Sequence, residues 1–331
     1  MNAPGEQQLF EKEPSRTDVA LSLAIAEYDR TRPIIDGRVK PPGIKLDIDC
    51  AWIGDFCHFP VYEKYDIAEM SFSWYVAARL RGEPVIALPV FPLRMAVHGY
   101  LFCRSDDPFK SPRDLAGKCI ASTGYRYTVN LWVRGIMKEH YGVAPEQMHW
   151  VTNEAEGAGF QIPKDIDVTV VKGRSPDELL FAHEVDAVVG AVIPESFQRG
   201  DPRIRRIFPD TRAEMRDYYK KTGIFPITHT IVMKESLARE EPWIAENLVH
   251  AFRESQRLCD ELNAEPKRHS LPESVFILEE QHAAYGRNPW KHGLEPNRHV
   301  VEAFVRYAHE QGYIPRRPEI EELFAPNTLA L

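Results

Sequence analysis

The sequence lacks two features that would point to a membrane or a nucleic-acid partner. No apolar stretch among its 331 residues approaches the ~20 residues that a membrane span requires. Lysine and arginine number 41 against 49 aspartates and glutamates, so the formal net charge of -8 gives no general attraction to nucleic acid or anionic membranes. An anion-binding site in this chain would therefore be local and built from a few arginines.

The cysteines are too scattered to predict a disulfide framework or a structural zinc site. There are 5 of them, with no C-x-x-C pair: Cys50, Cys57, Cys103, Cys119 and Cys259. An odd, dispersed set favours a reducing compartment. Residues 1–17 are polar and lack the apolar core of a secretory signal, so we expect a flexible tail and a cytoplasmic protein.

Common catalytic motifs are also missing. The 12 histidines form no H-E-x-x-H, H-x-H or H-x3-H pattern, so we predict no catalytic metal. The chain has no phosphate-binding loop of the G-x-x-x-x-G-K-[ST] type and no G-x-S-x-G nucleophile elbow. The function must be sought in other residues.

Strand-like and helix-like segments alternate along the chain. "VALSLAI", "GIKLDIDC" and "YDIAEMSF" predict three strands, and "SWYVAARLRG" predicts a helix that ends at Gly82. A similar unit starts at "SPRDLAGKCIAS", and "TVNLWVRGIMKEHYGV" predicts a helix within it. From "GIFPITHTIVM" the chain returns to a strand, followed by the long helix "PWIAENLVHAFRESQRLCDEL". This order predicts an α/β fold with a largely parallel sheet.

The same order predicts two lobes. We expect the first lobe to contain residues 18–103 and 229–331, with the second lobe, residues 104–228, inserted into it. Crossings near Arg104 and Thr228 would form a hinge. Ligands of such sheets bind beyond the carboxyl ends of the strands, here between the lobes.

Several segments together resemble one family. They are "EYDRTRPIIDGRV", "IAEMSFSWY", "LPVFPLRMAVH", "GYRYTVNLWVRGI", "GIFPITH" and "PWKHGLEPNRHVVEAFVRYAHEQGY". With them the chain resembles the 4,5-dihydroxyphthalate decarboxylase family, over nearly its whole length. The resemblance implies a two-lobed type II periplasmic-binding-protein-like fold, with mixed sheets flanked by helices, a hinge and a central cleft. Arg126 stands where the family commonly has Gln, and Val97-His98 where it has Arg-His, so an analogue of the dihydroxyphthalate stays an open alternative.

The resemblance implies a carboxy-lyase of phthalate degradation. It would convert 4,5-dihydroxyphthalate to 3,4-dihydroxybenzoate (protocatechuate) and CO2, without a cofactor, because a hydroxyl para to the leaving carboxylate activates the ring. The protein must hold a carboxylate, favour the phenolate and deliver a proton to the ring carbon. The expected partner is a small aromatic carboxylate, with no nucleic acid and no membrane. Homo-oligomer formation stays open.

Histidines are the candidates for proton transfer. His229 follows "FPIT" at the expected second crossing, and an unperturbed imidazole pKa of ~6.5 suits proton transfer near neutrality. His98, on the other crossing, is a second candidate. The alternative for both is a hydrogen-bonded histidine with a structural role.

Arginines and hydroxyls are the candidates for substrate binding. Arg126 and Thr128 stand where a helix begins, so a guanidinium, a hydroxyl and free amides would form a carboxylate socket. Arg94, in "FPLRMAVH", has few reasons to occupy a hinge strand except pairing or ligand contact. Ser71 and Ser73 end the third strand and would bond catechol oxygens, unless Ser73 only caps the following helix.

The stretch "EYDRTR" puts charge directly after a core strand. Asp29 would accept a proton or hydrogen bond from a catechol hydroxyl, and Arg30 or Arg32 would bind a carboxylate. The alternative is an internal Asp–Arg pair that only holds the loop.

Two other functions compete with the enzyme. A two-lobed fold also serves as the solute receptor of a transporter, which would carry a signal peptide or a lipobox cysteine. An effector-sensing regulator would need a DNA-binding domain before the first strand. We find neither in the sequence, so the enzyme is the favoured function.

Overall fold

The first of two sheets holds the N-terminal strands and one late strand. The computed structural model describes residues 18–50, 60–156 and 160–331. The strand order is β2-β1-β3-β11-β4. The bounds are Val19–Ile25 for β1, Ile44–Cys50 for β2, Ile67–Ser71 for β3, Val85–Leu88 for β4 and His229–Lys234 for β11. β1 runs parallel to β2 and β3, whereas β11 runs antiparallel to β3 and β4.

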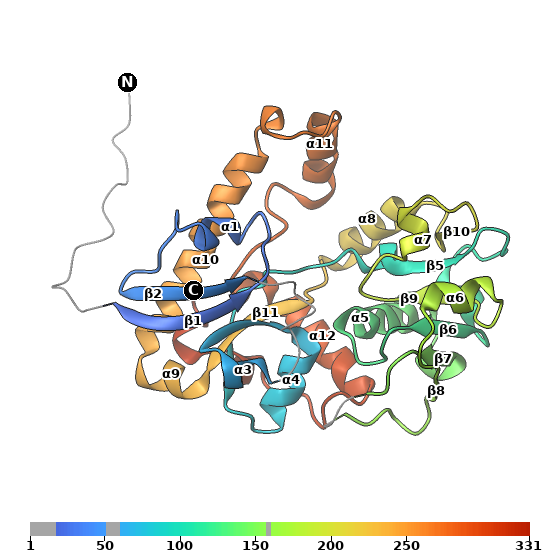
Figure 1. Cartoon of the computed structure of the whole chain (residues 1–331), viewed down its shortest axis with the longest axis horizontal. Coiled ribbons are helices and arrows are strands. Elements are labelled where there is room, and N and C mark those ends of the chain that lie inside the picture. Colours follow the sequence, from blue (N-terminus) through green and yellow to red (C-terminus); the bar gives the residue numbers. More distant parts are fainter. Residues whose placement is uncertain (1–17, 51–59, 157–159) are drawn as a thin grey trace.

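The second sheet lies beside the first (Figure 1) and is also mixed. Its order is β10-β5-β9-β6-β7-β8. The bounds are Leu101–Arg104 for β5, Cys119–Ser122 for β6, His149–Thr152 for β7, Asp167–Val170 for β8, Ala187–Val189 for β9 and Ile204–Arg206 for β10. β6 is parallel to β7 and β9, and β5 is antiparallel to β9 and β10. The expected α/β architecture with mixed sheets is confirmed.

Helices cover both sheets. Their bounds are Arg32–Ile35 (α1), Val61–Lys64 (α3), Phe72–Leu80 (α4), Thr128–Ile136 (α5), Pro176–Phe181 (α6), Glu195–Gln198 (α7), Thr211–Thr222 (α8), Glu235–Glu240 (α9), Pro242–Asn263 (α10), Ser274–Tyr285 (α11) and Arg298–Glu310 (α12). α10 packs on one face of the first sheet, and α4, α5 and α12 share a core with the other face. α6 covers the second sheet.

Local sequence signals explain many element ends. Ser111 and Ser175 each cap a helical turn through a capping box, as expected from their spacing to Asp114 and Glu178. The predicted helix from Thr128 is α5 continued by a π-helical turn, and it ends at Gly142 with φ 71. None of the described helices is long and apolar enough to cross a bilayer.

Two chain crossings join the sheets and pair with each other. The amides of Thr228 and His229 donate to the carbonyl of Leu93, at 3.0 and 3.2 Å, and the amide of Met95 donates to that of Pro226. Because β5 starts at Leu101 and belongs to the second sheet, the first crossing precedes Arg104, where we had expected it. The division into lobes 18–103 plus 229–331 and 104–228 stays a prediction.

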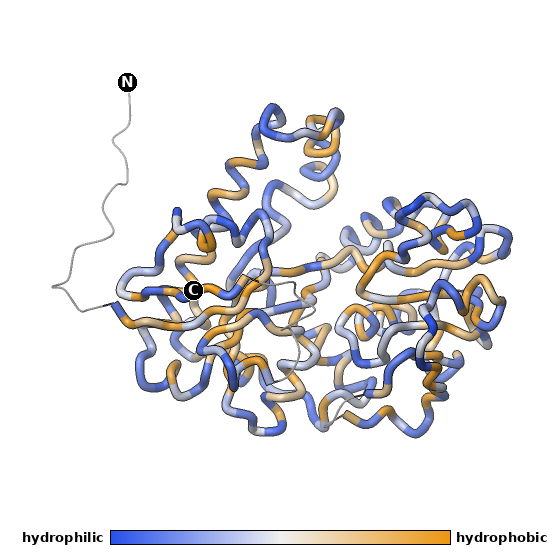
Figure 2. The backbone as a smooth tube through the Cα atoms, in the orientation of Figure 1, coloured by the Kyte–Doolittle hydropathy of each residue, from blue (hydrophilic) through white to orange (hydrophobic). Residues whose placement is uncertain are grey.

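Helix α5 fills the space between the two sheets. All nine of its residues are buried, and Trp132 on it donates its indole N–H to the carbonyl of Ile227 at 2.7 Å. Arg134, also on α5, donates to Gln311 beyond α12 at 2.8 Å. Figure 2 shows apolar segments along the strands of both sheets, on either side of this helix. One continuous core therefore spans both halves of the molecule.

Candidate active site

The ends of three strands of the first sheet meet at one edge. β1 and β3 run parallel and end there, and β11 begins there because it is antiparallel to β3. His229, the first residue of β11, is paired with Ser71, the last residue of β3. Directly paired residues present their side chains on the same face of a sheet. The topology thus brings two predicted site residues together although they are far apart in the sequence.

His229 is held by a buried carboxylate that the sequence reasoning missed. Its Nδ1 lies 2.7 Å from Oε1 of Glu69, whose side chain is 0% exposed. The imidazole itself keeps an exposed fraction of 11%, and its Nε2 hydrogen-bonds to none of the described residues. His229 can therefore exchange a proton through Nε2 while Nδ1 stays bound.

Two groups from the end of β1 complete the surroundings of Glu69. The hydroxyl of Tyr28 donates to Oε1 at 2.9 Å, and the amide of Ala26 donates to Oε2 at 3.3 Å. The signal for Glu69 was present in the sequence as one acid inside the otherwise apolar strand "IAEMS". Such a residue is rarely buried without a specific partner.

Hydroxyl groups join β3 and α4 to the start of α5. Oγ of Ser71 lies 2.7 Å from Oγ1 of Thr128, which also accepts a hydrogen bond from the amide of Ser73 at 3.0 Å. The hydroxyl of Ser73 donates to the carbonyl of Arg126 at 3.2 Å. Because α4 already begins at Phe72, the alternative in which Ser73 caps it is wrong.

Arg126 carries a buried guanidinium that has no hydrogen-bond acceptor among the described residues. The residue is 1% exposed, and none of its three side-chain nitrogens has a partner in the described parts of the chain. Its guanidinium carbon lies 3.6 Å from the ring centre of Trp74 and 5.3 Å from that of Phe160. Burial, together with the nearby Arg81, lowers its pKa to about 10, so the group is still cationic at neutral pH.

Other groups near the expected carboxylate socket already have hydrogen-bond partners. Oε1 of Glu156 accepts from the amides of Tyr125 at 2.6 Å and Arg126 at 3.2 Å, so these amides are not free. The Thr128 hydroxyl is taken up by the two serines. Of the side-chain donors predicted at this helix start, the Arg126 guanidinium alone still lacks an acceptor among the described residues.

Arg30 is the second arginine at this edge. Its guanidinium lies between two aromatic rings, 4.3 Å from the centre of Tyr28 and 4.1 Å from that of Trp290. It donates to the carbonyl of Pro92 and to Asp29, whose oxygen is 3.1 Å away. The Arg30 side chain is 12% exposed and that of Asp29 is 54% exposed. The internal pair that we considered as the alternative is therefore present.

The sequences of two curated proteins match most of this chain. It is 33% identical to 4,5-dihydroxyphthalate decarboxylase of Comamonas testosteroni, over 93% of this chain and 97% of the relative. It is 32% identical to 4,5-dihydroxyphthalate decarboxylase of Pseudomonas putida, over 60% of this chain and 81% of the relative. The chain belongs to the 4,5-dihydroxyphthalate decarboxylase family. No protein-family profile matches it.

Solved structures with the same fold include binding proteins and an enzyme. The sulfonate-binding protein SsuA of Methylobacillus flagellatus aligns with a TM-score of 0.61 and 14% identity, covering 96% of this chain and 94% of the other. The aliphatic sulphonate binding protein SsuA of Escherichia coli gives 0.54 and 12%, covering 94% and 92%. The desulfurization enzyme DSZB gives 0.52 and 14%, covering 94% and 97%. These matches show that this decarboxylase-family chain has the two-lobed binding-protein fold.

Arg94 and Arg32, which we predicted to bind substrate, are bonded to other residues of the protein. Arg94 donates to the carbonyls of Phe225 and Lys291, at 3.1 and 2.9 Å, and to the side chain of Asn297. It therefore ties the first crossing to two later loops. Arg32 forms an exposed ion pair with Glu27 at 2.7 Å and does not join the other site residues.

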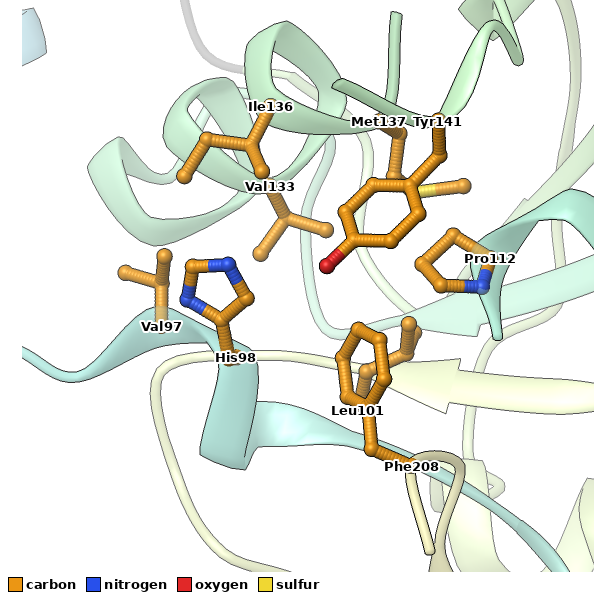
Figure 3. Close-up of a pocket in the computed structure, with 9 residues that line it drawn as sticks. All are labelled: Val97, His98, Leu101, Pro112, Val133, Ile136, Met137, Tyr141 and Phe208. Carbon is orange, nitrogen blue, oxygen red and sulfur yellow. The ribbon is translucent and has the colours of Figure 1, made fainter. Parts of the chain in front are cut away.

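His98 lies in an apolar environment (Figure 3), with its ring against those of Phe208 and Tyr218. The side chains around it include Val97, Leu101, Val133 and Phe208, and the cavity left between them measures only about 10 Å³. Burial, together with the nearby His140, lowers the pKa of His98 to about 4. A neutral imidazole in so small a space is typical of a structural histidine, so our proposals do not use it in catalysis.

The described residues offer no cluster of candidate metal ligands. In these parts of the chain no three His, Cys, Asp or Glu side chains gather in a way that would hold a metal ion. The geometry described above contains an acid–base group, a buried cation and hydroxyls, which are the elements of proton-transfer chemistry on an anion.

Proposed function

We propose that this family member decarboxylates 4,5-dihydroxyphthalate to 3,4-dihydroxybenzoate and CO2. His229 supplies the proton, and Arg126 and Arg30 bind the substrate's carboxylates. The observation that carries the proposal is the Arg126 guanidinium, which is buried without an acceptor in the described chain. The backbone carbonyl of the same residue accepts from Ser73, whose amide shares the Thr128 hydroxyl with Ser71, the residue paired with His229.

A buried cation without an acceptor is costly for the ligand-free protein. Desolvating an unpaired guanidinium costs several kcal/mol in an interior, and buried polar atoms are almost always hydrogen-bonded. Such a group is retained where a ligand supplies the missing charge. A carboxylate fits, because its two oxygens match the fork of the guanidinium. Trp74 beside Arg126 also offers an aromatic surface for a ring-shaped substrate.

The reaction needs one proton delivered to one carbon. A hydroxyl para to the leaving carboxylate pushes electron density to the carbon that bears it. His229 transfers a proton from Nε2 to that carbon. The bond to the carboxylate then breaks, its electron pair returns to the ring, and CO2 leaves as aromaticity is restored. Arg126 holds the carboxylate that stays, and the hydroxyl groups of Ser71 and Ser73 lie nearby to bond polar substituents.

The loop after β1 contributes mainly through Arg30. The carboxylate of Asp29 already pairs with this guanidinium and accepts from the side chain of Asn263 at 3.1 Å. We assign Asp29 to holding Arg30 in place, and Arg30 to the second carboxylate of the substrate. The cytoplasmic location and the part in phthalate degradation remain predictions.

A turnover assay tests the function. Purified protein treated with a chelator is incubated with 4,5-dihydroxyphthalate, and 3,4-dihydroxybenzoate and CO2 are quantified. We expect equal amounts of both, and a value of kcat/KM that falls about 10- to 100-fold in Arg126→Met. Arg32→Met, which removes only an exposed ion pair, serves as the matched control and should retain full activity. Binding of the substrate without turnover would instead support a solute receptor.

A further inference from the structure

We infer that Glu69 is a positioning residue for proton transfer: it fixes the imidazole of His229 so that Nε2 is the atom that serves the substrate. The inference rests on the proposed function and adds a residue to it. Glu69 lies in the interior of β3, two residues before the end of the strand where Ser71 and His229 pair. Among the described residues, His229 is the base that lies within ion-pair distance of its carboxylate.

The burial of Glu69 makes its contact with His229 specific. Its side chain is 0% exposed, and among the described residues no Lys or Arg lies within ion-pair distance of it. A buried carboxylate is unfavourable unless hydrogen bonds compensate it. Glu69 makes such bonds with His229, Tyr28 and Ala26, so the imidazole is held in one orientation for proton transfer.

The same contact selects the reactive nitrogen. The 2.7 Å approach of Nδ1 to Glu69 requires Nδ1–H to donate, since a carboxylate only accepts. The cationic imidazole then carries its second proton on Nε2. After this proton moves to the ring carbon, the neutral imidazole keeps Nδ1–H on Glu69, and Nε2 takes one proton from water before the next turnover. One proton is consumed for each CO2 released.

Neighbouring groups hold Glu69 in this orientation. The Tyr28 hydroxyl and the Ala26 amide each donate to the carboxylate, and the amide of His229 donates to the carbonyl of Leu93. The ring of Tyr28 also lies 4.3 Å from the guanidinium carbon of Arg30. The proposed carboxylate-binding arginine and the proton donor therefore share one support.

The first experiment compares two variants, Glu69→Gln and Asp66→Asn. The second changes a carboxylate directly before the same strand. The amide introduced by Glu69→Gln is isosteric and still accepts from Tyr28, but it carries no charge. We expect kcat to fall at least about 100-fold with little change in KM. Asp66→Asn, which loosens contacts to Ser22 and Lys234, is the control for structural damage. It should keep the wild-type kcat.

The second experiment needs no substrate, so it separates this inference from the proposed function. Nitrogen-15 spectra of histidine-labelled protein, assigned with His229→Gln, report which nitrogen carries the proton. We expect neutral His229 to be protonated at Nδ1 in the wild type and to become a mixture of tautomers in Glu69→Gln. An unchanged tautomer in the variant, or a retained kcat, would overturn the inference. Absence of turnover with the tautomer shift intact would overturn only the proposed function.

Discussion

Oγ1 of Thr128 lies 2.7 Å from Oγ of Ser71, and this contact joins the two halves of the molecule at the site. Ser71 ends a strand of the first sheet, and Thr128 begins the helix that follows the second sheet's β6. The same helix is buried against α4 and α12 along its whole length. The proposed substrate site therefore lies where the halves are already in contact.

We predict that Thr128→Val destabilises the protein by about 1–3 kcal/mol. The substitution keeps the shape of the side chain but leaves the buried amide of Ser73 without its acceptor. Denaturant unfolding of the ligand-free protein measures the change. As a control, Ser105→Ala removes an exposed hydroxyl that bonds the carbonyl of Pro202, and it should change the free energy of unfolding by less than about 0.5 kcal/mol. Equal effects of both variants would argue against the interlobe role of Thr128.

For Arg126→Met, we predict a protein that is at least as stable as the wild type without ligand. The variant removes a buried charge that has no acceptor in the described residues and keeps an apolar stem on Trp74. Phthalate, which lacks the activating hydroxyls, is a suitable unreactive ligand. At 100 times its Kd it should stabilise the wild type by about 2.7 kcal/mol in thermal unfolding and the variant by much less. A clear loss of stability without ligand would mean that Arg126 has a structural role.

Features that depend on residues close together in the sequence were predictable, whereas contacts between distant residues were not. The capping boxes at Ser111 and Ser175 and the alternation in β2 were predictable, because each depends on residues within a few positions. Glu69 was not recognised, because its partner His229 is 160 residues away and comes next to it only through the pairing of β3 with β11. A buried acid in a strand signals a partner but not which one.

The roles of the arginines were hard to predict for the same reason, because their partners lie far away in the sequence. Arg126 was predicted as a carboxylate ligand from its place before a helix, but the amides beside it are taken by Glu156, 30 residues further on. Arg94 and Arg30 looked alike in the sequence. In the structure Arg94 donates to the carbonyls of two distant loops, whereas Arg30 donates to Pro92 and Asp29 and also lies against two aromatic rings.

His98 should make the stability of the protein depend on pH. Its pKa is about 4 in the folded state and ~6.5 when unfolded. The unfolded chain thus binds the proton first as the pH falls, so stability is complete above pH ~6.5 and is lost on acidification toward pH ~4. Between pH 7 and pH 5 this single group accounts for about 2 kcal/mol.

The variant His98→Gln measures this contribution. Its stability at pH 7 will be lower because packing is disturbed, but its free energy of unfolding should fall less between pH 7 and pH 5, by about 2 kcal/mol. His309→Gln, at an exposed histidine, should keep the wild-type slope. A wild-type slope in His98→Gln would show that other groups dominate the acid sensitivity.

The two arginines of the site should act on different carboxylates of one ligand. Arg126 lies at the start of α5, on the side of the second sheet, whereas Arg30 lies at the end of β1 in the first. Within the described parts of the chain, no hydrogen bond or stacking contact joins them: Arg126 contacts Trp74 and Phe160, and Arg30 contacts Tyr28 and Trp290. Calorimetric binding of phthalate to both single methionine variants and to the double variant tests this arrangement.

We expect each single substitution to weaken phthalate binding by about 1.5–3 kcal/mol, the range for a charge-assisted hydrogen bond. The double variant should lose the sum to within about 0.5 kcal/mol, because independent contacts add. Benzoate, with one carboxylate, should be affected by one of the two substitutions and nearly indifferent to the other. A double variant no weaker than the worse single variant would mean that both arginines serve the same carboxylate, and the assignment of Arg30 to a second one would then fail.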